Sequence, residues 1–189
     1  MNVNALLGGF DDPAIQSARA FRALLQAMAR PGTIWPVAGA TPPAPLSVAA
    51  GVVLLTLTDG TTPVHLAGSA DCAAVRDWIS FHTGAPICPA DTAMFAVGRW
   101  ADLGPVDRFP VGLPDYPDRA VTLIVEVDDL TPQGARLTGP GIKDTARLSL
   151  PELAAFQANR ALFPLGFDTY LTCGDQVAGL PRSTRVEDV

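Results

Sequence analysis

Apolar residues recur at helical spacing near the start of the chain. Asp12 suits a helix cap, Pro13 suits the first turn, and the Pro31-Gly32 pair should end the helix. The apolar positions between these signals are Ile15, Ala18, Phe21, Leu25 and Met28. Because they are three or four positions apart, they predict an amphipathic helix that ends at about residue 30.

Short apolar runs follow, separated by prolines and glycines. Residues 33–37 and 62–66 predict short strands. Residues 46–57 fit either a buried helix or a strand, but their length and their start after Pro45 favour a helix. The pattern thus begins to alternate between strands and helices.

The alternation continues in the middle of the chain. Ser69 or Asp71 suits the cap of a helix whose apolar face includes Trp78. Residues 92–97 then predict a strand, and residues 104–117, which are rich in proline and glycine, predict a loop.

Residues 121–127 carry the clearest strand signal. Their sequence Val-Thr-Leu-Ile-Val-Glu-Val is almost continuously apolar, which is typical of a strand with both faces covered by helices. Strands separated by helices along the whole chain predict an α/β fold, arranged as a three-layer α/β/α sandwich with a mixed sheet.

The last part of the chain predicts one helix and then strands. The helix should begin at Pro151, capped by one of the two residues before it. Residues 167–186 predict two or three short strands, separated by turns at 174–175 and at Gly179.

Length and composition indicate one folded domain. The chain has 189 residues, of which 48% are hydrophobic and 17% are charged, so it can build one substantial core. We therefore expect residues 1–189 to form a single domain. The longest nearly apolar run, residues 46–57, is too short for the roughly 20 residues that span a bilayer.

Charge narrows the choice of partners. The chain has 13 basic and 19 acidic residues, a net charge of −6, and so lacks the positive charge that nucleic acids and anionic membranes attract. We expect neither as a partner. Residues 1–9 have no secretory signal, and the three cysteines form no paired motif, so we expect a cytoplasmic protein with reduced thiols.

Few side chains stand in a recognisable catalytic or binding pattern. His82 follows a predicted helix and suits general acid–base chemistry, with a structural role as the alternative. The turn with Gly139 and Gly141 suits an anion, or is simply rigid. Arg182 suits a carboxylate or phosphate ligand, or a salt bridge or subunit contact. Lys143 is the chain's one lysine, so any mechanism that needs a lysine nucleophile must use it.

Several phrases stand in a fixed order along nearly the whole chain. They are residues 21–22, 28–32, 81–85, 116–117, 137–142, Asn159 with 163–168, and 180–184. Each phrase is weak alone, but the ordered set is specific. In this order they resemble the PhnH family, which are subunits of the bacterial carbon–phosphorus lyase system for phosphonate use.

The resemblance implies a subunit that pairs with itself and joins PhnG, PhnI and PhnJ in a core complex. With PhnL, that complex converts ATP and an alkylphosphonate to a ribose 1-alkylphosphonate 5-triphosphate, before PhnJ cuts the carbon–phosphorus bond. The resemblance also implies a fold similar to pyridoxal-phosphate-dependent transferases without that cofactor. Separately, the two histidines, His65 and His82, stand in no metal-binding spacing, so we expect no metal site. The candidate ligand or interface residues are His82, Gly139, Gly141, Asn159 and Arg182.

Three functions stay open. The first, which we favour, is a structural or substrate-guiding subunit, because the sequence has neither a nucleotide-phosphate fingerprint nor a cysteine cluster for an iron–sulfur centre. The second is a subunit that binds ATP or phosphonate and contributes residues to a shared active site. The third is an independent transferase.

Overall fold

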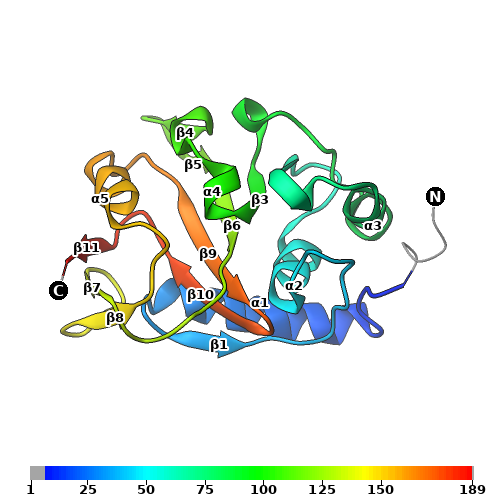
Figure 1. Ribbon diagram of the computed structural model, residues 1–189, viewed down its shortest axis with the longest axis horizontal. Helices are drawn as coiled ribbons and strands as arrows, with labels where there is room; N and C mark the ends of the chain where they lie inside the picture. Colours follow the sequence, from blue (N-terminus) through cyan, green and yellow to red (C-terminus); the bar gives the residue numbers. More distant parts are fainter. Residues whose placement is uncertain (1–6, 189) are drawn as a thin grey trace.

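A six-stranded mixed sheet lies at the centre of the computed structural model, which describes residues 7–188 (Figure 1). The strand order is β1-β10-β9-β6-β3-β2. The strands are β1 (Ile34–Pro36), β2 (Val64–Leu66), β3 (Phe95–Arg99), β6 (Thr122–Glu126), β9 (Asp168–Cys173) and β10 (Gln176–Leu180). Strands β2, β3, β6 and β9 are parallel, whereas β10 is antiparallel to both its neighbours. The predicted α/β class with a mixed sheet is confirmed.

The pleat of this sheet sends alternate side chains into two hydrophobic cores. Ile124 and Tyr170 pack on the first face, against the helices α1 (Pro13–Ala29), α2 (Val48–Leu57) and α3 (Ala73–Thr83). Leu123 and Leu171 pack on the second face. That face is covered by α4 (Trp100–Leu103), α5 (Leu153–Ala161) and a small sheet of β7 (Ala135–Thr138), β8 (Ala146–Leu148) and β11 (Arg185–Glu187). The second outer layer is therefore partly β-structure rather than wholly helical.

Helix α1 packs unusually closely on strand β10. The sequence predicts a turn at Gly179, and that prediction is wrong, because Gly179 lies inside β10. A Cβ atom there would lie 2.6 Å from the backbone carbonyl carbon of Ala27 in α1. The glycine is thus required by the close approach of a helix rather than by a turn. The other predicted turn, at residues 174–175, is confirmed.

Two predicted helix starts are also wrong. Helix α3 follows Cys72, because Ser69 lies in a separate 3₁₀ turn, Gly68–Ala70. Helix α5 follows Glu152, so Pro151 lies outside the helix. Asp71, the other predicted cap, ends the 3₁₀ turn and pairs with Arg76.

The proline-rich stretch predicted as a loop contains a hairpin. Strands β4 (Val111–Leu113) and β5 (Tyr116–Ala120) pair with each other as a separate two-stranded sheet. Pro117 fits β5 because a two-stranded ribbon leaves one edge of each strand without ladder hydrogen bonds. The strand predicted at residues 92–97 is confirmed in part: β3 begins at Phe95, and Thr92 ends a 3₁₀ turn, Ala90–Thr92.

The parallel strands place their carboxyl ends at one edge of the sheet. From this edge β2 leads to α3 on the first face, whereas β3 leads to α4 on the second face. Where adjacent connections leave for opposite faces, a crevice opens between the strand ends. No helix within residues 7–188 is both long and apolar enough to cross a bilayer. The sequence predicts no secretory signal in residues 1–9, and residues 1–6 of that segment lie outside the described residues.

Candidate functional site

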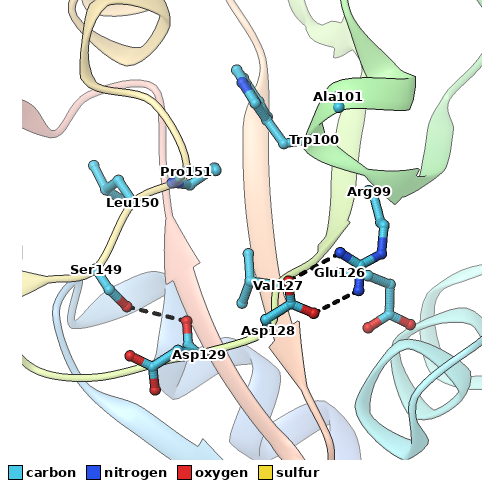
Figure 2. A pocket seen from close by; sticks show the side chains of 10 residues that line it. All are labelled: Arg99, Trp100, Ala101, Glu126, Val127, Asp128, Asp129, Ser149, Leu150 and Pro151. Carbon is cyan, nitrogen blue, oxygen red and sulfur yellow. Dashed lines mark hydrogen bonds and ion pairs between the residues drawn. The ribbon is translucent and has the colours of Figure 1, made fainter.

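A cavity of about 430 Å³ lies at the carboxyl ends of β3 and β6 (Figure 2). We call it the strand-end cavity. Its walls are formed by Arg99, Trp100, Ala101, Glu126, Val127, Asp128, Asp129, Ser149, Leu150 and Pro151. A smaller cavity of about 180 Å³ shares Arg99, Glu126 and Val127 with it and reaches Ser47 and Ser69. Polar groups from five separate segments therefore converge at this edge of the sheet.

Glu126, the last residue of β6, ties three elements together at the cavity. Its Oε1 accepts a hydrogen bond of 2.7 Å from the backbone N–H of Ser47, the residue that caps α2. Its Oε2 accepts one of 3.1 Å from the hydroxyl of Thr172 in β9. Burial raises the pKa of Glu126, although these hydrogen bonds offset part of the effect. The carboxyl group is thus held in place and can take up a proton more readily than an exposed glutamate.

Arg99 and Asp128 form an ion pair at the mouth of the cavity. Two guanidinium nitrogens of Arg99 donate to the two carboxylate oxygens of Asp128, one of them at 3.0 Å (Figure 2). The side chains are 57% and 80% exposed, so the pair adds little stability. The guanidinium group lowers the pKa of Asp128. The pair therefore presents an ionised and oriented carboxylate to the cavity.

Trp100 supplies an aromatic wall, and a hydroxyl group lies across from it. The indole N–H donates to Glu152 at 2.8 Å, and the ring stacks on Phe156 with 5.1 Å between centroids. Ser149 accepts a hydrogen bond of 2.9 Å from the N–H of Thr131. A fixed aromatic ring beside oriented polar groups is the usual composition of a site for a small polar molecule.

The sequence interpretation missed these residues. Arg99, Trp100 and Glu126 stand in no motif, and their proximity depends on the parallel pairing of β3 with β6, in which Arg99 lies opposite Glu126. One signal was available, because Asp128 and Asp129 directly follow the clearest predicted strand. Polar residues after a buried parallel strand indicate the ligand edge of an α/β sheet.

His82 anchors the start of the described chain. Its Nε2 donates to the carbonyl oxygen of Leu7 at 3.2 Å, and its ring lies 5.1 Å from that of Trp78. A Cβ atom on Gly9 would lie 2.5 Å from the imidazole ring, so the backbone passes directly over it. These contacts match the structural alternative for His82.

Gly139 and Gly141 form a turn after β7 that packs on other backbone segments. A Cβ atom on Gly141 would lie 2.0 Å from the carbonyl oxygen of Ala29 at the end of α1. Gly141 has a φ of 81° and Gly139 a φ of 131°, conformations that favour glycine. The contacts match the alternative of a rigid turn. Lys143, just beyond it, is exposed and does not line the strand-end cavity.

Asn159 and Arg182 lie together near the amino end of β9. Arg182 donates to the Asp168 carboxylate from Nε at 3.1 Å and from a terminal nitrogen at 2.6 Å, and to the carbonyl of Pro117 at 2.6 Å. Buried Asn159 exchanges two hydrogen bonds of 2.8 Å with the backbone of Phe167. Both residues line a crevice with almost no volume open to a water-sized molecule.

The five candidate residues from the sequence therefore do not form one site, and none of them lines the strand-end cavity. Asn159 and Arg182 lie together, while His82 and the Gly139–Gly141 turn contact other parts of the chain. That any of them contacts a ligand or a partner stays a prediction. Within residues 7–188, no cluster of three or more His, Cys, Asp or Glu side chains is placed to hold a metal ion.

The amino-acid sequence of this chain is similar to those of known phosphonate-metabolism proteins. The family model for the bacterial phosphonate metabolism protein PhnH matches residues 8–187. The chain is 42% identical, over 95% of its length and 94% of the relative's, to the PhnH subunit of alpha-D-ribose 1-methylphosphonate 5-triphosphate synthase from Rhizobium meliloti (strain 1021). It is 30% identical, over 88% of its length and 84% of the relative's, to HtxG of Stutzerimonas stutzeri, which is named as a C-P lyase subunit protein.

Replacing Arg182 should lower stability because it leaves Asp168 largely buried without its partner. The side chains of the pair are only 13% and 26% exposed. We expect Arg182→Ala to lower the free energy of unfolding by on the order of 3 kcal/mol. The control is Arg76→Ala, whose pair with Asp71 is 47% and 38% exposed and should contribute less than about 1 kcal/mol. Urea denaturation measures both, and equal losses would contradict the structural role of Arg182.

The raised pKa of Glu126 predicts a pH-dependent stability. Below the ordinary value of 4.5 the side chain is neutral in the folded and unfolded chain alike. As the pH rises through the higher folded value, the unfolded chain ionises first, so this residue stabilises the fold less. We expect the free energy of unfolding of the native chain, relative to Glu126→Gln, to fall as the pH rises above about 4 and to level off once the folded chain is ionised as well. Urea midpoints across this range measure it. A constant difference, or one that grows with pH, would refute the expectation.

Proposed function

This chain belongs to the PhnH family of bacterial phosphonate metabolism proteins, and from that premise we propose that it is a subunit of the complex that makes α-D-ribose 1-methylphosphonate 5-triphosphate. The identity of 42% across nearly the full length of both chains carries this proposal. The resemblance noted in the sequence is confirmed by the family match. The carbon–phosphorus lyase link has further support from the similarity to HtxG.

Within the complex we propose a substrate-guiding or structural role beside PhnG, PhnI and PhnJ. The strand-end cavity supports it, because its polar groups are oriented for binding. We also propose that the family's transferase-like scaffold works here without pyridoxal phosphate. The position of Lys143, exposed beyond the Gly139–Gly141 turn and outside the cavity lining, supports this view.

Assembly tests the proposed function directly. A tagged form of this chain, expressed with PhnG, PhnI and PhnJ, should elute with all three as one complex. The purified chain alone should not convert ATP and methylphosphonate. The control is the same co-expression without this chain, with the tag on PhnG. Elution of this chain by itself would refute the subunit role, and turnover by the chain alone would favour an independent transferase.

We propose that a second copy of this chain packs against the outer face of α1. Ile15, Phe21 and Leu25 lie on that face and are each about half exposed, at 51%, 51% and 52%. The buried face of the same helix, with Ala20, Leu24 and Ala27, already packs on the sheet. Large apolar side chains that share one helix face and remain exposed are typical of an association surface.

A single charge on this face should weaken self-association. We expect the native chain to have a solution mass of twice 19.7 kDa. Phe21→Asp should shift the equilibrium toward the monomer by about tenfold or more, because a buried carboxylate would lack a partner. The control is Ala74→Asp on the exposed side of α3. Light scattering across a dilution series measures the mass, and a native chain that stays monomeric would refute the dimer.

A further inference from the structure

The strand-end cavity has the size and position of a small-molecule site. Its volume of about 430 Å³ lies within the roughly 300–1,000 Å³ typical of such sites. It lies outside the carboxyl ends of β3 and β6. The smaller cavity that shares Arg99 and Glu126 with it lies where the connections after β2 and β3 leave for opposite faces of the sheet. Open α/β sheets bind ligands at this position for a geometric reason, because there the connections diverge and leave room.

The charges of the cavity favour hydrogen-bond donors over anions. Glu126, Asp128 and Asp129 line it with carboxyl groups, while Arg99 supplies one guanidinium group, which Asp128 already engages. A phosphate group inside the cavity would face more negative than positive charge. Hydroxyl groups, in contrast, can donate to the remaining lone pairs of a carboxylate.

Two features fit a pair of neighbouring hydroxyl groups attached to a flat or apolar body. The Asp128 carboxylate is held from one side by two donors of Arg99, so its orientation is fixed before a ligand arrives. Trp100, Val127 and Pro151 add an apolar wall in the same cavity. The indole ring of Trp100 is fixed by Glu152 and Phe156, so little side-chain entropy would be lost when a ligand binds.

We propose that the strand-end cavity binds a ribose-bearing molecule, with vicinal ribose hydroxyls donating to the Asp128 carboxylate and the attached base against the Trp100 wall. This inference rests on the proposed function, since the relative's product is a ribose derivative that carries a triphosphate. The cavity's carboxylates repel the phosphate groups of such a ligand. The phosphate groups would therefore extend toward solvent or a neighbouring subunit. The chain would thus hold the sugar end of the substrate and leave the phosphate end free.

Binding of adenosine to the full-length purified chain tests this site. Calorimetry should show saturable binding of one adenosine per chain, and 2′,3′-dideoxyadenosine should bind at least about tenfold more weakly, because it lacks both donors. Asp128→Asn should weaken adenosine binding by a similar factor. The control Asp115→Asn changes an exposed carboxylate at the β4–β5 turn, outside the cavity, and should bind as the native chain does.

Three results would overturn the site: no saturable adenosine binding, equal binding of the dideoxy compound, or native affinity in Asp128→Asn. Circular dichroism of each variant establishes that it is folded. Co-elution of Asp128→Asn with PhnG, PhnI and PhnJ separates the two proposals. A chain that assembles but does not bind adenosine keeps its proposed function and loses this site, whereas one that binds adenosine but does not assemble does the reverse.

Discussion

The Glu126 carboxyl group is the contact on which the carboxyl edge of the sheet depends. It ends the central strand β6, accepts a hydrogen bond from the backbone N–H of Ser47, which caps α2, and accepts another from Thr172 in β9. The start of α2 is therefore tied to the sheet by a partly buried acid as well as by apolar packing. Ionising this acid has an energetic cost, which the raised pKa of Glu126 expresses. Glu126 also borders both cavities, so the same carboxyl group that holds α2 and β9 forms part of their walls.

The two edges of the sheet differ in how their polar groups are satisfied. At the amino edge, Arg182 donates hydrogen bonds to Asp168 and Pro117, and Asn159 donates to Phe167. The crevice beside them has almost no open volume. At the carboxyl edge the main ion pair is exposed and borders open cavities. Groups with satisfied partners stabilise a fold, whereas oriented groups beside open volume can exchange solvent for a ligand.

Residues 121–127 could be predicted from sequence because their apolar run is almost continuous, and the first helix because its apolar positions recur at helical spacing. The large apolar residues that predicted the helix, such as Phe21 and Leu25, nevertheless lie on its exposed face, while the buried face carries Ala20, Leu24 and Ala27. Gly179 shows the limit of this approach. A glycine inside a strand is read locally as a turn, and only the backbone of Ala27, far away in sequence, explains it. The hairpin of β4 and β5 was missed for a related reason, because its prolines and glycine predict a loop until the pairing is known.

The candidate site was harder to predict because residue type alone does not show which side chains border an open cavity. His82 and Arg182 have the chemistry of ligand-binding groups, yet the fold uses both to hold backbone segments. Arg99 and Glu126 looked ordinary, and they meet only because two parallel strands end in register. In an α/β chain, the position of a polar residue relative to the end of a buried strand is therefore more informative than its chemistry. On that criterion Asp128, two residues beyond β6, marks the edge of the sheet that borders the strand-end cavity, and there Arg99 orients its carboxylate with two donors.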